Sequence, residues 1–157
     1  MTQAAPAQTE RAFRLIYRSR DRIPAERRRA ELGELFSAAR AHNKRARITG
    51  ALLVSDDWFV QTLEGEETAV RALYDRIAAD PRHDSITLLE ARAVDRRVFA
   101  RWAMARVSED AGSDVPLIAH ADGIAPAAPR GDTTPEQAYL LLVMRDATRV
   151  DPVAAGS

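Results

Sequence analysis

Apolar and polar residues alternate near the start of the chain, so that Phe13, Leu15 and Tyr17 fall on one face of a predicted strand. From about Glu26 the apolar spacing changes to three and four residues, which predicts an amphipathic helix. Asn43 ends this helix on its apolar side, because it lies close to a whole number of helical turns beyond the first apolar position. The pattern therefore turns two polar side chains, Tyr17 and Asn43, towards the core.

The same periodicities continue along the rest of the chain. They predict these further elements in order: a strand over 48–54, a strand over 59–64, a helix over 70–77, and strands over 86–93 and 98–107. Alternation places Gln61 on the apolar side of its strand and puts Trp102 and Met104 together on one face of the last strand. Gln61 is thus a third polar residue that is predicted to face the core.

This order of elements predicts an α+β fold, a ferredoxin-like βαββαββ sheet with two helices on one face and the first and third strands as central neighbours. We assign residues 12–107 to this domain, after a flexible N-terminus of residues 1–11. The Gly-, Pro- and Ala-rich residues 108–133 are typical of a loop-rich connector with at most a short helix near 115–121. Residues 134–157 are expected to form a C-terminal cap helix and a tail.

The predicted C-terminal helix has clear start signals and an unusually apolar sequence. Thr134 is a candidate N-cap, and Pro135 occupies the first helical position. The apolar run over residues 139–144 must be covered, either by the helix-free face of the sheet or by another subunit.

Composition limits the classes of function. The chain has 157 residues, with 23 basic and 23 acidic side chains, which fits one globular domain and gives no overall charge to attract nucleic acid. Arginines cluster between residues 18 and 29, but interleaved glutamates favour a solvated helix face over a nucleic-acid site. The absence of cysteine excludes disulfides and thiolate metal sites, and the scattered histidines suggest no metal site. No apolar run is long enough for a signal peptide or a membrane span, so we expect a cytoplasmic protein without a membrane partner.

The three polar residues on core faces come from three different elements. A buried polar group without a hydrogen bond costs about 1–3 kcal/mol, so Tyr17, Asn43 and Gln61 need mutual bonds, trapped water or a polar ligand. A flat heterocycle with carbonyl and nitrogen edges would satisfy all three. The alternative is that each residue bonds nearby backbone, with Asn43 capping its helix, Tyr17 at a strand end and Gln61 on a bulge.

Short motifs surround these residues in uninterrupted order: Tyr17 with Ser19; Asn43 with Ile48-Thr49-Gly50 and Leu52-Leu53; Phe59, Gln61 and Leu63-Glu64-Gly65; Leu73-Tyr74 and Arg76-Ile77; Asp80-Pro81-Arg82-His83; and Arg97, Phe99, Trp102 and Met104. On these motifs, from about Phe13 to Val107, the sequence resembles the BLUF family, the blue-light sensors that use FAD. The resemblance covers the whole predicted domain and none of the predicted core positions departs from it.

The resemblance implies a blue-light photoreceptor with a flavin bound non-covalently between the two helices, FAD or else FMN or riboflavin. Tyr17 and Gln61 would be the photochemical pair: light drives an electron and a proton from the phenol to the ring, and the amide is left rotated or tautomerised in a red-shifted state. The resemblance also implies flavin contacts for a further set: His42, Asn43, Arg76, Asp80, Arg82 and His83. From the residues alone, Arg76 and Asp80 could instead form a surface ion pair, and the two histidines could be solvated helix-end residues.

Trp102 and Met104 resemble the family's output pair, with ordinary strand packing as the alternative. Ile48, Phe59 and Leu63 either line the ring pocket or belong to the plain core. The signal would pass to the C-terminal helix and then to an unknown protein partner or to a change of homo-oligomer through that helix or a sheet face.

Two other classes of function compete with the photoreceptor. One is a flavin-free ferredoxin-like module for protein interactions, which would have no reason to keep three polar groups facing its core. The other is a flavin redox enzyme, which is weaker because the sequence lacks a nicotinamide-binding fingerprint. We therefore expect a sensor and not an enzyme.

Overall fold

The computed structural model describes residues 12–55, 57–100, 102–108, 115–120, 123–126 and 135–148. The elements along the chain are β1 (Ala12–Asp21), the 3-10 turn η1 (Ala25–Arg27), α2 (Arg28–Ala46), β2 (Thr49–Val54), β3 (Trp58–Gly65), α3 (Glu67–Ala78), β4 (His83–Val94), β5 (Ala105–Ser108), β6 (Val115–His120), β7 (Gly123–Pro126) and α4 (Pro135–Ala147). The expectations for residues 1–11, for Thr134 and for the tail lie outside the described residues. Among the described helices, none combines the length and the apolar character that a membrane span requires.

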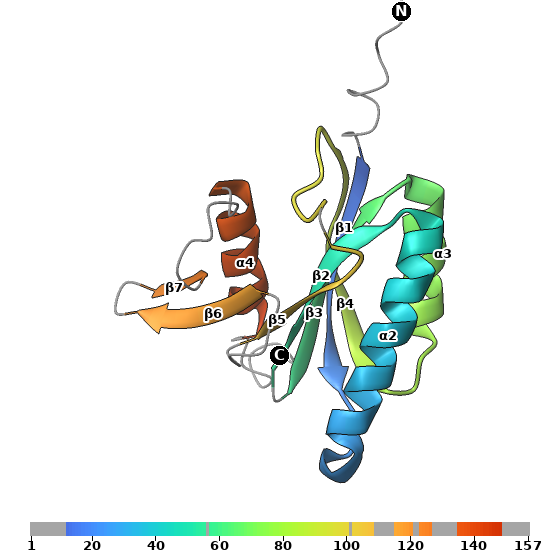
Figure 1. The fold of residues 1–157 in the computed structure, drawn as a ribbon, viewed down its shortest axis with the longest axis vertical. Helices are drawn as coiled ribbons and strands as arrows, with labels where there is room; N and C mark the ends of the chain where they lie inside the picture. Colours follow the sequence, from blue (N-terminus) through green and yellow to red (C-terminus); the bar gives the residue numbers. More distant parts are fainter. Residues whose placement is uncertain are drawn as a thin grey trace, which may run out of the picture.

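The sheet has β1 and β3 as antiparallel neighbours in the strand order β4-β1-β3-β2-β5-β6-β7. Helices α2 and α3 both lie against one face of it (Figure 1). Leu32 and Phe36 of α2 and Val70 of α3 are buried there against apolar side chains of the central strands. The predicted ferredoxin-like arrangement, with two helices on one face, is confirmed.

Helix α4 covers the opposite face of the sheet (Figure 1). Its Leu140, Leu141 and Met144 are buried against residues of the sheet and of the β4–β5 connection: Ile16, Ala51, Leu53, Val60, Phe99, Ala105 and Val107. Fully burying one large apolar side chain contributes about 1.5–3 kcal/mol, so the sheet face stabilises the helix through these three residues. Tyr139 and Leu142 of the same apolar run remain exposed. At the C-terminal end of α4, Arg18 Nη1 donates to the carbonyl oxygen of Ala147 at 3.3 Å.

The last predicted strand is shorter than expected. Of residues 98–107, the part that pairs in the sheet belongs to β5, which begins at Ala105. The fully buried Glu64 carboxylate accepts the backbone N–H groups of Val98 at 2.9 Å and of Phe99 at 2.8 Å. Because these N–H groups are bound to a side chain, they are not available to a strand ladder.

The prediction that Trp102 and Met104 share one face is therefore wrong. Met104 is buried in the cluster between the sheet and α2–α3, whereas Trp102 packs against the cluster under α4, with its ring 6.4 Å from that of Phe99. The two side chains lie on opposite faces because the residues before β5 do not form a regular strand.

The short helix predicted near residues 115–121 is also wrong. These residues form β6, which pairs in parallel with β5 and is followed by the antiparallel β7. Val115 and Ile118 are β-branched, which favours an extended backbone, and the edge of β5 offers a strand partner. The expected connector thus contains a strand pair.

Candidate functional site

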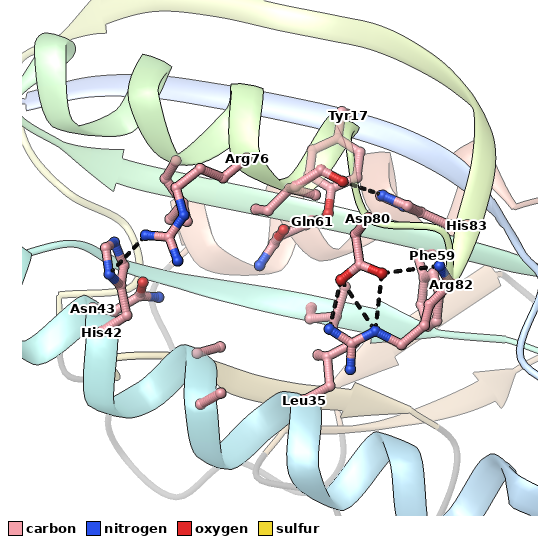
Figure 2. Close-up of a pocket in the computed structure, with 15 residues that line it drawn as sticks. Tyr17, Leu35, His42, Asn43, Phe59, Gln61, Arg76, Asp80, Arg82 and His83 are labelled. Carbon is pink, nitrogen blue, oxygen red and sulfur yellow. Dashed lines mark hydrogen bonds and ion pairs between the residues drawn. The ribbon is translucent and has the colours of Figure 1, made fainter.

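A cavity of about 200 Å³ lies between the sheet and the α2–α3 layer (Figure 2). One water needs about 10–15 Å³ of such volume, so the cavity has room for a much larger ligand. Its polar lining contains every residue for which a flavin contact is predicted: Tyr17, His42, Asn43, Gln61, Arg76, Asp80, Arg82 and His83. The rest of the lining is apolar: Leu35, Ala38, Ala39, Leu52, Phe59, Leu73 and Ile77. Of the three residues weighed between pocket and core, Phe59 lines the cavity, while Ile48 and Leu63 belong to the core.

Of this apolar lining, the sequence points only to Phe59 as a possible wall of the ring pocket. Leu35, Ala39, Leu73 and Ile77 lie on the apolar helix stripes, which signal burial but do not separate a cavity wall from plain core. The two helices therefore supply the apolar walls, and the sheet supplies most of the polar floor.

Tyr17 and Gln61 form the floor of the cavity. They are direct cross-strand partners in the β1–β3 ladder, which places both side chains on the helix-covered face. The Tyr17 hydroxyl donates to Gln61 Oε1 at 2.5 Å, and both residues are buried, with exposed fractions of 3% and 4%. The oxygen of the Gln61 amide is thus bound to Tyr17. The nitrogen of the same amide lies 3.4 Å from the sulfur of Met104, which is a weak acceptor. The alternative of a bulge at Gln61 is not what the structure shows, because both pairings of β3 run through Gln61 without a register shift.

The Tyr17 phenol is held in its neutral form. Burial raises its pKa well above the usual value, and the nearby Tyr74 and Asp80 add to the shift. The ring of Tyr74 lies 5.6 Å from that of Tyr17, so a second aromatic ring packs against the phenol. The phenol consequently donates its hydrogen bond to Gln61 over the whole physiological pH range.

Within the described part of the chain, the side-chain amide of Asn43 makes a hydrogen bond through its nitrogen but not through its oxygen. The residue is 1% exposed, and its Nδ2 donates to the carbonyl oxygen of Ala103 at 2.7 Å. Its Oδ1 is buried and has no hydrogen-bond partner among the described residues. The alternative that this side chain caps its own helix is not what the structure shows, because the helix end is closed by Arg47, with a left-handed φ of 58°. A ligand N–H in the cavity would satisfy the free oxygen.

The mouth of the cavity carries two cationic side chains in different settings (Figure 2). Arg82 donates from Nε and Nη2 to the carboxylate of Asp80, at 3.0 and 2.5 Å, and these bonds hold the pKa of Asp80 below its usual value. The alternative interpretation, a surface ion pair between Arg76 and Asp80, is therefore not what the structure shows. Arg76 Nη1 instead lies 3.4 Å from His42 Nδ1, and burial, together with Arg76 and Arg45, lowers the pKa of His42.

His83 is a buried residue and not a solvated one, with 8% of its surface exposed. Its Nε2 lies 2.5 Å from the carbonyl oxygen of Ile77, which can only accept, so this nitrogen carries the proton. Its Nδ1 lies 2.6 Å from Ser19 Oγ, which ties the ring to β1. The imidazole thus stands edge-on to the ring of Tyr17 at 6.2 Å and fixes the end of α3 beside the cavity.

The arrangement suits a flat heteroaromatic ligand with a polar edge. The floor offers the acceptor Asn43 Oδ1 and the Gln61 amide, and both match a ring edge that carries N–H and carbonyl groups. The apolar walls would cover the faces of such a ring. Among the described residues, no group of three histidine, aspartate or glutamate side chains is placed to hold a metal ion.

Comparisons with known proteins identify the family of the chain. The family model BLUF, described as sensors of blue-light using FAD, matches residues 12–105. The chain is 37% identical over 83 residues to the photoactivated adenylate cyclase subunit beta of Euglena gracilis, which covers 52% of this chain and 10% of that protein. It is 37% identical over 92 residues to the blue light- and temperature-regulated antirepressor BluF of Escherichia coli (strain K12), which covers 57% of this chain and 22% of the relative. These matches span a small part of the relatives' length.

Solved structures give the same grouping. The dark-state structure of BlrB, a BLUF protein, is 36% identical with a TM-score of 0.58, covering 62% of this chain and 73% of that one. The photo-activated state of BlsA is 33% identical with a TM-score of 0.61, covering 64% and 71% of the two chains.

Proposed function

The chain belongs to the BLUF family of blue-light sensors that use FAD, and on this basis we propose that it is a blue-light photoreceptor that binds a flavin without a covalent bond. The observation that carries the proposal is the buried Tyr17–Gln61 hydrogen bond on the floor of a cavity that also holds the unsatisfied Asn43 Oδ1. A buried polar atom without a partner costs about 1–3 kcal/mol, so a module without a ligand would have no reason to keep this set.

The ring of the flavin would be held by the floor and the walls of the cavity. Asn43 Oδ1 would accept the imide N–H of the ring, and the Gln61 amide would face the edge that carries N5 and O4. His83 would act through Tyr17, by holding the phenol ring in place. FAD is the flavin that we propose, although FMN and riboflavin carry the same ring and would meet the same floor.

The ribityl and phosphate groups would lie at the mouth of the cavity. Arg76 and Arg82 are the cations there, and guanidinium groups are strong donors to phosphate. Asp80 orients Arg82 through its paired hydrogen bonds, while the neutral His42 accepts from Arg76. We propose that these four side chains contact the chain of the flavin beyond its ring.

A bound oxidised flavin supplies the absorption of blue light and, once excited, an acceptor for one electron and one proton. Tyr17 is the proposed donor, because its protonated phenol can release an electron while its proton leaves along the hydrogen bond to Gln61. Gln61 suits the relay because a primary amide accepts at oxygen and donates at nitrogen, whereas an ionised carboxylate only accepts. The electron and the proton then return to Tyr17, so no group is left oxidised. Gln61 would be left rotated or tautomerised, and a new hydrogen bond from its side chain to the ring would shift the absorption to the red.

Trp102 and Met104 are the proposed output pair. Met104 touches Gln61, and Trp102 packs on the α4 side, so a turn of the amide would affect both faces of the sheet. We propose residues 12–107 as the sensing domain and α4 as the element that passes the signal to a protein partner or to a change of oligomer. We also propose a sensor and not an enzyme, because the matched family is described as sensors of blue light.

The test is the visible absorption of the purified protein, with and without added FAD, before and after blue light and during recovery in the dark. Flavin bands that move to the red and then return support the photoreceptor. Tyr17→Phe should keep the bands and lose the shift, whereas the neighbouring Tyr74→Phe should keep both. Flavin bands that do not move would favour a redox or structural flavin. A protein that stays colourless with FAD would leave the flavin-free interaction module.

A further inference from the structure

The chain just before β5 is held at the cavity through its carbonyl oxygens. We call residues 102–104 the output segment. The backbone N–H of Gly50 donates to its first carbonyl oxygen at 3.1 Å, and Asn43 Nδ2 donates to the second at 2.7 Å. Arg40 Nε donates to the third at 3.0 Å. Three donors from β2 and α2 therefore fix the course of a segment that has no regular secondary structure.

The position of this segment decides what the Gln61 amide touches. Met104, the last residue of the segment, is 1% exposed, and its sulfur lies 3.4 Å from Gln61 Nε2. A thioether sulfur is a weak acceptor, so this contact depends on the backbone that carries it. Because the Met104 side chain is buried and close-packed, a donor that holds its carbonyl also limits how far the sulfur can move from the amide.

Of the three donors, Arg40 can be changed with the least disturbance of the cavity. Asn43 lines the cavity, and a Cβ at Gly50 would lie 2.0 Å from the carbonyl oxygen of Thr62. Arg40 is not a lining residue, and its guanidinium lies over the ring of Phe36 with 5.2 Å between the guanidinium carbon and the ring centroid. Stacking on a buried ring keeps the guanidinium in place, and a charged donor forms a stronger hydrogen bond than a neutral one.

We infer that Arg40 is a positioning residue, which keeps the Met104 sulfur on the Gln61 amide and so sets how fast Gln61 turns back in the dark. The inference rests on the proposed function. A buried amide cannot turn unless the sulfur beside it moves aside, because protein interiors are close-packed. The Arg40 bond to the Met104 carbonyl opposes that movement. A chain without this bond should therefore return from the red-shifted state more quickly.

The test compares dark-recovery rates of the flavin-loaded full chain. Arg40→Ala should recover about tenfold or more faster than the wild type, as expected when one charge-assisted hydrogen bond is lost from a barrier. Arg40→Lys keeps a cationic donor and should restore part of the slow recovery. Arg29→Ala removes an exposed arginine from the same helix and should recover at the wild-type rate. Recovery of Arg40→Ala at the wild-type rate would overturn the inference.

A second readout does not depend on light. The chain has three methionines, so methyl-labelled methionine gives three resolvable NMR signals, and Met104→Leu assigns the relevant one. Arg40→Ala should shift or broaden the Met104 signal and leave the signal of Met144, on the opposite sheet face, unchanged. An unchanged Met104 signal would contradict the inference that Arg40 holds the output segment. If the wild type shows no light response, the proposed function fails, while this signal still reports whether Arg40 holds the segment.

Discussion

The buried hydrogen bond between Tyr17 and Gln61 predicts that the two single substitutions are not additive. The sum of their losses in the free energy of unfolding should exceed the loss in the double variant. The hydroxyl donates to Gln61 Oε1 at 2.5 Å, and both residues are nearly inaccessible to solvent. Gln61→Leu would leave a buried hydroxyl without its acceptor, and Tyr17→Phe would leave a buried amide oxygen without its donor. Each should lower the free energy of unfolding by about 1–3 kcal/mol.

The double variant Tyr17→Phe/Gln61→Leu places two apolar side chains against each other. Its loss should be smaller than the sum of the two single losses, with a coupling free energy of about 0.5–3 kcal/mol. Urea unfolding followed by circular dichroism measures all four proteins, without flavin and with saturating flavin, since a bound ligand adds its own stabilisation. Tyr74→Phe combined with Gln61→Leu is the matched control and should be additive. Additivity of the Tyr17 and Gln61 losses within about 0.5 kcal/mol would refute the reasoning.

Three further predictions concern the cofactor, pH and the C-terminal helix. Asn43→Ala removes the free Oδ1 and the bond to the output segment, so the flavin dissociation constant should rise about tenfold or more in a fluorescence titration; an unchanged constant would contradict the assigned contact. Because burial raises the pKa of Tyr17, the light-induced shift should be constant from about pH 7 to about pH 10, where an exposed tyrosine ionises. Above about pH 10 the unfolded chain loses a proton from Tyr17 that the folded chain keeps, so the free energy of unfolding should fall. If the light-induced absorption shift disappeared at a pH below that of unfolding, the neutral phenol would be contradicted. Met144→Ala should lower the free energy of unfolding by about 2–5 kcal/mol and leave flavin affinity unchanged, because Met144 is fully buried on the face opposite the cavity; a weakened affinity would argue against separate faces.

The sequence is sufficient for the parts of the fold that local periodicity controls. Alternation of period two places Tyr17 and Gln61 on the same face, and the β1–β3 register then makes them direct partners. The helical stripe places Asn43 on the buried side of α2, where it is 1% exposed. The other polar residues of the cavity are expected from the family resemblance and not from periodicity: His42, Arg76, Asp80, Arg82 and His83.

Long-range hydrogen bonds account for what the sequence does not predict. Residues 98–104 alternate like a strand, yet the buried Glu64 carboxylate binds the N–H groups of Val98 and Phe99 and keeps them out of the sheet. Side-chain partners are equally hidden, because the helical spacing favours a pair of Asp80 with Arg76, while the turn after α3 brings Arg82 closer. The hydrogen bond from Arg40 to the output segment joins residues far apart in the chain and has no local signature.

The most direct test of the central claim is the light-minus-dark absorption difference of flavin-loaded Gln61→Leu, measured beside the wild type. Gln137→Leu is the matched control, because it replaces another buried glutamine, on α4. The wild type and the control should show a red shift under blue light that reverses in the dark, whereas Gln61→Leu should bind flavin and show no shift. A reversible red shift in Gln61→Leu would contradict the account.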